Sequence, residues 1–137
     1  MEKGPTVRRG DIFFVPFPYA SDFRQAKKRP ALVIQNDLGN RFASTVIVAL
    51  ISSSIPKKSY PMHYRIEHPS EVARAAGLRR QSVVKMETLV TLPKRALLRR
   101  LGSLPKAALR EADQALAYSL SLRLAFVAGW SVSPLTP

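Results

Sequence analysis

The residues best suited to chemistry begin with a run of cations, Arg24-Gln25-Ala26-Lys27-Lys28-Arg29, that ends at Pro30. Residues 18–29 form a polar connection, and four positive charges within six residues of it make a surface that suits phosphate groups. Composition alone leaves a solvated charged loop as an open alternative. The run therefore predicts a site for a polyanion without identifying one.

Arg29 differs from its neighbours because Pro30 follows it. A residue before proline is driven out of the helical region into an extended conformation. A short apolar strand is expected directly afterwards, over residues 31–34. An arginine held at the start of a strand has a more fixed position than one on a loop, so it is better placed to bind a phosphate through two hydrogen bonds. We therefore expect Arg29 to be the anion-binding residue of this segment.

Hydroxyls and one carboxylate form the second set of candidates. Ser52, Ser53 and Ser54 follow the most hydrophobic run of the chain, residues 45–51, and could donate hydrogen bonds to phosphate oxygens. A strand end satisfied by small polar residues is the structural alternative. Glu87, in a long β-prone stretch, could accept a hydrogen bond from a base edge or simply be an exposed strand residue.

Several residue patterns that are common in catalytic sites are absent from the sequence. His63 and His68 lie on or beside an expected strand without metal-ligand spacing, and a solvated or structural role is favoured for each. There is no glycine-rich phosphate loop and no close acidic pair of the kind a two-metal site needs. The absence of cysteine excludes disulfides, thiolate metal sites and cysteine nucleophiles. We expect no metal and no cofactor.

Size and charge agree with a polyanion partner. The chain has 137 residues, which corresponds to one domain on a prior of roughly 150 residues per domain. Its 22 Lys and Arg against 9 Asp and Glu give a net charge of +13, enough for a strong positive field on a small surface. Nucleic acid is the first expected partner. No segment resembles a signal peptide or a membrane span, so a cytoplasmic location is expected.

The elements that must position these residues are short. Strands are expected over residues 11–17, 31–34, 45–51 and 62–67, with a longer β-prone stretch over 81–92 broken around residues 85–88. Residues 36–40 carry turn chemistry. Short helices are expected over residues 71–76 and 94–101. A longer helix opens at Pro105 with the apolar stripe Leu109, Ala112, Leu116, Leu120, Leu124 and Val127. The pattern predicts a compact, barrel-like α+β domain.

Four segments together resemble a known family. Arg9-Gly10-Asp11 leads into IFFVPF, Arg29-Pro30 leads into ALVIQNDLGNRF, and TVIVALIS and SVVKMETLVTL follow in order. This pattern resembles the MazF/PemK (Kid) toxins of type II toxin–antitoxin systems, over about residues 8 to 125. Those toxins are sequence-selective, metal-independent endoribonucleases.

The resemblance implies a fold, partners and site residues. The fold would be an SH3-like β-barrel of about five to seven strands with short helices and a longer C-terminal helix. The toxin domain would span residues 8–127, between flexible ends at 1–7 and 128–137. It would form a homodimer that binds single-stranded RNA and is inhibited by the acidic tail of a MazE-like antitoxin. Arg29 and Ser52 match the catalytic pair; the supporting or RNA-binding residues would be Phe17, Arg24, Gln25, Lys27, Lys28, Ser53, Arg79, Arg80 and Glu87.

The chain departs from the family pattern in one place that bears on mechanism. Gln25 keeps its position, but Arg24 stands where many members carry an acid, which leaves a general base from that position in doubt. Two other functions therefore remain open at this stage. One is a CcdB-like toxin that binds DNA gyrase without catalysis, against which the retention of Arg29 and Ser52 argues. The other is a basic nucleic-acid-binding module whose catalytic loop has decayed.

Overall fold

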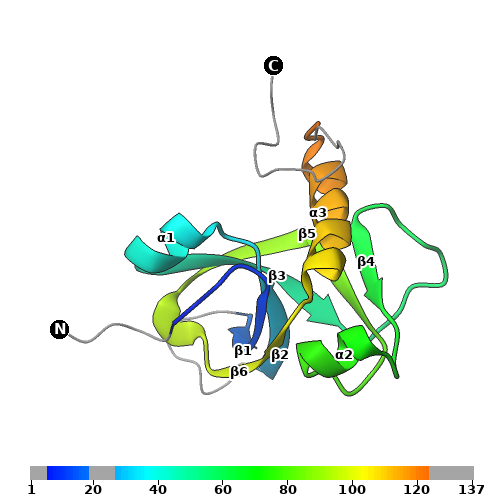
Figure 1. The fold of residues 1–137 in the computed structure, drawn as a ribbon, viewed down its shortest axis with the longest axis horizontal. Helices are drawn as coiled ribbons and strands as arrows, with labels where there is room; N and C mark the ends of the chain where they lie inside the picture. Colours follow the sequence, from blue (N-terminus) through cyan, green and yellow to red (C-terminus); the bar gives the residue numbers. More distant parts are fainter. Residues whose placement is uncertain (1–5, 19–26, 124–137) are drawn as a thin grey trace.

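The computed structural model describes residues 6–18 and 27–123 and contains one six-stranded sheet with helices at its sides and end (Figure 1). The elements in chain order are β1 (Asp11–Phe17), β2 (Lys27–Val33), α1 (Asp37–Phe42), β3 (Thr45–Ser52), β4 (His63–Ile66), α2 (Glu71–Ala76), β5 (Ser82–Pro93), the 3-10 turn η1 (Lys94–Ala96), β6 (Arg99–Ser103) and α3 (Lys106–Leu120). Among the described helices, none is long and apolar enough to cross a membrane.

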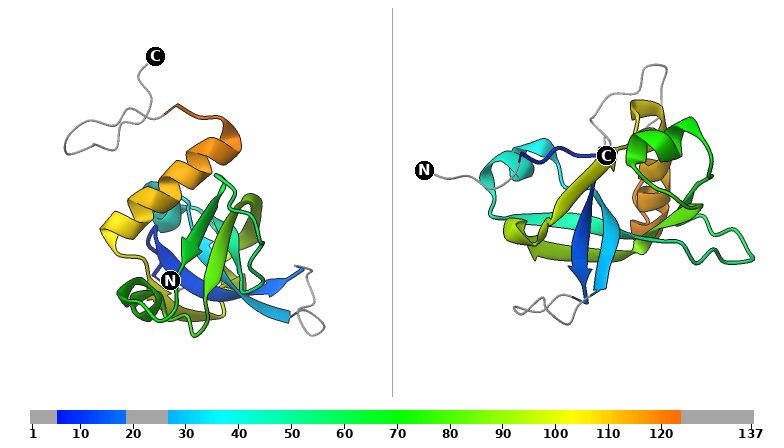
Figure 2. Two further views of the ribbon diagram at one scale, coloured as in Figure 1. Left: turned by 90° about the vertical axis from the view of Figure 1, so that its right-hand side faces the viewer. Right: turned by 90° about the horizontal axis from the view of Figure 1, so that it is seen from below.

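The sheet is antiparallel throughout, in the order β4-β5-β3-β2-β1-β6, and it curls into a half-barrel. The prediction of a barrel-like α+β domain with a C-terminal helix is confirmed. The strand expected over residues 45–51 is β3, which lies inside the sheet because it pairs with both β2 and β5. Figure 2 shows β1 and β2 projecting together beyond the rest of the sheet.

Two apolar clusters lie on the two faces of this sheet. One packs Ile12, Leu32 and Ile51 beneath α2 and α3. The other fills the inside of the curl and includes Ala31 and Leu50. Neighbouring residues of a strand point to opposite faces, so β2 and β3 contribute to both clusters in alternation. Val7 is buried in the second cluster, so packing begins within the expected N-terminal extension.

Three local predictions were wrong, each for a physical reason. Residues 36–40 do not form a simple turn: Asn36 caps α1, its side chain accepting from the amide of Gly39, and the turn residues open a helix. Residues 94–101 hold only one 3-10 turn before β6, which pairs with β1. Residues 27–29 belong to β2 rather than to the preceding connection. In each case a tertiary contact or a cap overrode local propensity.

The stripe expected on α3 was also partly wrong. The buried positions are all alanines, Ala108, Ala112, Ala115 and Ala117, of which only Ala112 belonged to the expected stripe, whereas Leu120 is half exposed. Leu109 and Leu116 pack only at the side of the core cluster. Small residues let the helix axis approach the sheet closely, so alanine rather than leucine marks its inner face. Leu124 and Val127 lie outside the described residues.

Helix α2 is held close to β6 by two glycines. It spans Glu71–Ala76, as the sequence predicts, with Ser70 as its N-cap, and Gly77 has a left-handed φ of 73°. A Cβ on Gly77 would lie 2.1 Å from the carbonyl oxygen of Leu101, and one on Gly102 would lie 2.1 Å from that of Ala75. Neither position accepts a side chain without backbone movement. This close approach forms one wall of the cleft described below.

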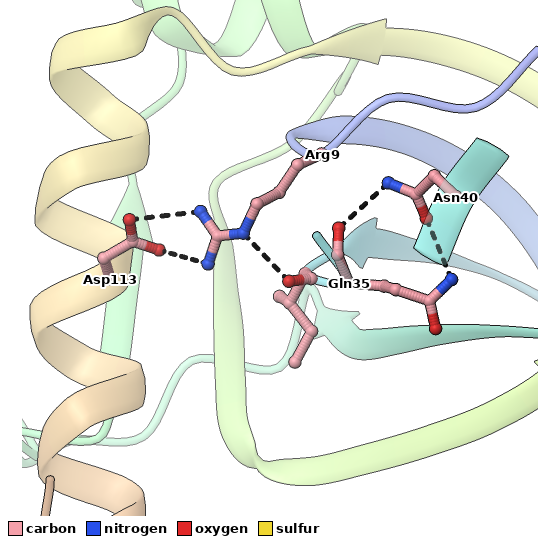
Figure 3. Close-up of polar contacts among 5 residues, drawn as sticks. Arg9, Gln35, Asn40 and Asp113 are labelled. Atoms are coloured by element: carbon pink, nitrogen blue, oxygen red, sulfur yellow. Dashed lines mark hydrogen bonds and ion pairs between the residues drawn. The ribbon is translucent and has the colours of Figure 1, made fainter. Parts of the chain in front are cut away.

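Arg9 joins elements that are distant in the sequence (Figure 3). Its guanidinium forms a bidentate ion pair with Asp113 of α3, at 2.7 and 3.1 Å, and donates through Nε to the carbonyl of Ile34 at 2.9 Å. Its backbone amide donates to the carboxylate of Asp37 at 2.7 Å. The start of β1, the end of β2, α1 and α3 are therefore fixed to one another.

Removal of the Asp113 carboxylate is expected to destabilise the fold. Asp113→Ala should lower the free energy of unfolding by about 2–3 kcal/mol, because it leaves the half-buried guanidinium of Arg9 without its charged partner. Urea denaturation followed by circular dichroism measures this change. Glu111→Ala, on the exposed side of α3, is the matched control and should change stability by less than about 0.5 kcal/mol. Equal effects of the two substitutions would contradict the assigned role of Arg9.

Candidate active site

Arg29 and Ser52 stand near the ends of the neighbouring strands β2 and β3. The paired register of these two strands ends with Ala31 opposite Leu50, two residues before Arg29 and Ser52, while Arg29 pairs with Val15 of β1. Since Ala31 and Leu50 belong to the cluster inside the curl, alternation puts Arg29 and Ser52 on that same face. A guanidinium and a hydroxyl thus share one face of the sheet where the two strands reach solvent.

The hydroxyl of Ser52 is oriented by the chain that follows it. The backbone amide of Ser54 donates to Ser52 Oγ at 3.0 Å. A serine oxygen that accepts in this way keeps its own hydrogen as a donor. Because the side chain is half-buried at the strand end, that donor is held near the surface. Ser52 can therefore offer a hydrogen bond to an anion beside Arg29.

A cleft of about 950 Å³ opens at the same end of the sheet, between β2, α2 and β6. Its lining contains many cations and, within the described residues, no carboxylate. The cationic side chains are Lys28, Arg29, Arg74, Arg79, Arg80 and Arg99. None of them forms an ion pair with another described residue. Unpaired like charges repel one another, so the cleft is suited to bind an anion of several charges.

The structure brings together five of the residues predicted from the sequence. Lys28, Arg29, Ser53, Arg79 and Arg80 all line the cleft. By alternation Lys28 and Ser53 face the α2 side of the sheet, whereas Ser52 faces the inside of the curl. The candidate site therefore includes residues on both faces of the sheet, around the ends of β2 and β3 that reach solvent.

The other predicted residues are distributed around this centre. Phe17 and Lys27 form the last register pair of β1 and β2, at the tip of the projecting strands. Glu87 lies in β5, and its Oε2 is 3.0 Å from Nε2 of His63. His63 is thus mostly buried and hydrogen-bonded to Glu87, which agrees with the structural role favoured for it. Arg24 and Gln25 lie outside the described residues.

Two arginines of the cleft were missed by sequence reasoning. Arg74 lies on α2, which the sequence did predict, but no pattern showed that this helix borders the cations of β2. Arg99 opens β6, in the segment expected to be helical. Had residues 99–103 been predicted as a strand beside β1, Arg99 would have been expected at the same end of the sheet as Arg29.

Glu87 is ionised more readily than an ordinary glutamate. Partial burial raises the pKa of its carboxyl. A hydrogen bond with His63, a hydrogen bond with the backbone and the electrostatic effects of His63 and Lys85 lower it by more, so the pKa lies below the usual value. At neutral pH the side chain is an anion and can only accept hydrogen bonds. Among the described residues, no group of three or more metal-ligating side chains is close enough to hold a metal ion.

Comparisons with known proteins match this chain and its fold to one family. Residues 8–120 match the model of the PemK-like, MazF-like toxins of type II toxin–antitoxin systems. Endoribonuclease EndoA of Bacillus subtilis (strain 168) is 38% identical over 116 residues, which cover 85% of this chain and 96% of that protein. The chain therefore belongs to the PemK-like, MazF-like toxin family.

Solved structures of the same class share the fold at low sequence identity. An endoribonuclease from mycobacterial species superposes with a TM-score of 0.69 and 20% identity, covering 90% of this chain and 100% of its own. A second, an endoribonuclease in complex with its cognate antitoxin, also from mycobacterial species, gives a TM-score of 0.66 and 21% identity, over 87% and 99% of the two chains. The half-barrel with a C-terminal helix is thus a known toxin fold.

Tripolyphosphate is expected to raise the Tm of the protein at low salt. An anion that binds only the folded state adds about 2.7 kcal/mol of stability at a concentration one hundred times its Kd. The rise should shrink when Arg74→Gln and Arg99→Gln are combined. It should persist in a matched variant with Lys106→Gln and Arg110→Gln on exposed positions of α3. Thermal melts at several tripolyphosphate concentrations measure it, and equal rises in both variants would contradict a binding site in the cleft.

Proposed function

We propose that this protein is a sequence-specific, metal-independent endoribonuclease that cleaves single-stranded mRNA in the cytoplasm and so inhibits translation and growth. The general activity follows from family membership: the protein is a toxin endoribonuclease of a type II toxin–antitoxin system. The details of the reaction are supported by one observation, that Arg29 and Ser52 stand on the same face at a strand end that is rich in cations. The family domain is proposed to span residues 8–127.

The proposed reaction uses a nucleophile that belongs to the substrate. The 2′-oxygen of a ribose attacks the adjacent phosphorus, the bond from phosphorus to the 5′-oxygen breaks, and the products carry a 2′,3′-cyclic phosphate and a 5′-hydroxyl. The 2′-hydroxyl loses one proton and the leaving 5′-oxygen gains one, so the reaction is balanced without water or metal. The protein needs only to position the phosphate and stabilise its extra negative charge.

Arg29 and Ser52 suit these two tasks. The guanidinium would neutralise charge on the pentacovalent phosphorane or protonate the leaving oxygen, and the Ser52 hydroxyl would donate to a non-bridging oxygen. Arginine is a poor general base because its pKa lies above about 12. Since Arg24 stands where the family carries an acid, we assign no side chain to the removal of the 2′-hydroxyl proton.

The remaining cations suit the two partners that we propose. Lys27, Lys28, Arg79 and Arg80, with Arg24, would bind phosphates on either side of the scissile one, and Phe17, Gln25 and Ser53 would contact the nucleotides. A cognate MazE-like antitoxin with an acidic tail would compete for the same surface, to which the net charge of +13 is complementary. The antitoxin complex among the structural neighbours supports this partner. We also propose a homodimer as the active form.

Arg29→Ala and Ser52→Ala are each expected to lower the cleavage rate by about 10²–10³, because each removes one donor to the transition state. Ser52→Thr keeps the hydroxyl and should retain most activity. Ser44→Ala, just before the opposite end of β3, is the matched control and should cleave like the parent. The assay incubates a long RNA in EDTA, maps the cuts by primer extension and analyses the chemistry of the ends.

Full activity in a folded Arg29→Ala or Ser52→Ala variant would contradict the assignment, as would a strict requirement for magnesium. Bound but uncleaved RNA in the parent protein would favour the decayed binding module. An inert protein that binds no RNA would be tested next against DNA gyrase.

RNA affinity is expected to fall steeply with salt, because phosphate contacts release counterions. For the slowly cleaving Ser52→Ala variant and single-stranded RNA, contacts to about five phosphates would give a slope of about −3.5 in a plot of log affinity against log salt. Fluorescence anisotropy with a labelled RNA measures it. A flat salt dependence would argue against the cationic surface as the RNA site.

A further inference from the structure

The floor of the cationic cleft lies on the sheet face opposite to Ser52. Phe14 of β1 stands two residues after Ile12, which packs beneath α2, so alternation puts Phe14 on the same face. Phe14 pairs with Pro30 of β2 on one side and with Arg99 of β6 on the other. Register partners in a sheet share a face. The row of three residues therefore faces α2, whereas Ser52 faces the inside of the curl.

The wall of the cleft is formed by α2 and the chain directly after it. Arg74 is an exposed residue of this helix, and Arg79 and Arg80 follow within a few residues. The close approach of the backbones at Gly77 and Gly102 leaves no space between α2 and β6. The cations of the wall are therefore carried by a segment whose distance from the floor is fixed.

The cations of the cleft differ from their neighbours in having no acidic partner. Arg100 points to the other face from Arg99, and its guanidinium lies 3.3 Å from the carboxylate of the buried Asp11. Lys28, Arg74 and Arg99 form no ion pair with another described residue. Like charges that line one concavity repel one another, so a polyanion that enters it lowers the energy of all of them.

The density of charge in the cleft matches linked phosphates better than a nucleic acid strand. RNA carries one negative charge for each nucleotide, so the short piece that fits a volume of about 950 Å³ brings few charges. Linked phosphates carry their charges with no nucleoside between them. Arginine binds phosphate oxygens through two parallel hydrogen bonds, and this concavity has the size usual for small-molecule sites.

We propose that the cleft on the α2 face binds a small oligophosphate, free or attached to a nucleoside, and that this ligand inhibits RNA cleavage by competing for Arg29. The binding stands on the geometry of the cleft alone, whereas the inhibition rests on the proposed ribonuclease function and adds its regulation.

Arg29 is the link between the two faces of the sheet. Alternation starts its side chain on the face of Ser52, yet this exposed side chain also lines the cleft. One guanidinium cannot bind a scissile phosphate and an oligophosphate on the other face at the same time. Lys28, Arg79 and Arg80, proposed above to bind RNA phosphates, border the cleft as well. An occupied cleft therefore withdraws cations from the RNA.

Isothermal titration calorimetry at low salt, without magnesium, tests the binding with tripolyphosphate and orthophosphate as probes. Tripolyphosphate should bind once per chain and at least about tenfold more tightly than orthophosphate. Combining Arg74→Gln with Arg99→Gln should raise its Kd about tenfold or more, because two charged donors are lost. Lys106→Gln with Arg110→Gln, on exposed positions of α3, removes the same charge and should change the Kd less than about twofold. Equal changes in the two variants, or several equivalent sites per chain, would overturn the site.

ATP as a second probe distinguishes the two sources of the ligand. Half-buried Phe14 offers an aromatic surface on which a base can stack. Tighter binding of ATP than of tripolyphosphate, with this advantage lost in Phe14→Leu, would support a nucleoside polyphosphate. Equal affinities would support a free oligophosphate. The tripolyphosphate affinity of Phe14→Leu reports that its cleft is intact, and failure of both probes to bind the parent protein would overturn the proposal.

RNA cleavage in EDTA tests the inhibition separately. Tripolyphosphate should slow the parent protein at concentrations near its measured Kd. The variant that combines Arg74→Gln and Arg99→Gln should need at least about tenfold more to lose the same fraction of its own uninhibited rate. Undiminished cleavage at saturating tripolyphosphate would overturn the inhibition. A rise in the KM for RNA equal to the rise in Kd would make the cleft part of the RNA path and overturn a separate site. A parent protein that binds tripolyphosphate but never cleaves RNA would contradict the proposed function and leave the binding site in place.

Discussion

The contact on which the rest of the structure depends is the bidentate ion pair between Arg9 and Asp113. Through it and its neighbouring hydrogen bond, α3 is fixed to the carbonyl of Ile34, the residue directly after β2. Both charged side chains are mostly removed from water, so the geometry is held more strongly than in a surface pair. Because β2 is anchored at that end, its other end can project into solvent and still present Arg29 at a defined register position.

Register explains how one sheet can hold two sites on opposite faces. A slip of one residue between β2 and β3 would move Arg29 to the α2 face and separate it from Ser52. Alternating burial on both faces prevents that slip, since Ala31 and Leu32 belong to different clusters. The same constraint keeps the row from β6 to β2 on the other face. The core that stabilises the fold therefore also sets the spacing of the residues that would meet RNA.

The sequence predicted local features well and contacts between distant segments poorly. The strand over residues 45–51 and the helix over residues 71–76 followed from local sequence patterns. The strand β6, with sequence RRLGS, lacks an apolar alternation and exists because it pairs with β1. Arg29 and Ser52 were found through the pre-proline position, the strand end and the family resemblance. Arg74 and Arg99 were not, because only the packing of α2 against β6 brings them into one cleft.

The position of Glu87 poses a problem that its neighbours resolve. An acid on the face proposed to bind RNA would repel the phosphates that dominate binding. The cation of Lys85 lies near this carboxylate, and the contacts with His63 and Lys85 hold the pKa of Glu87 below its ordinary value, so the anion persists at neutral pH. Glu87 is therefore a directional hydrogen-bond acceptor among cations, and it can attract only a group that brings a donor within hydrogen-bonding distance.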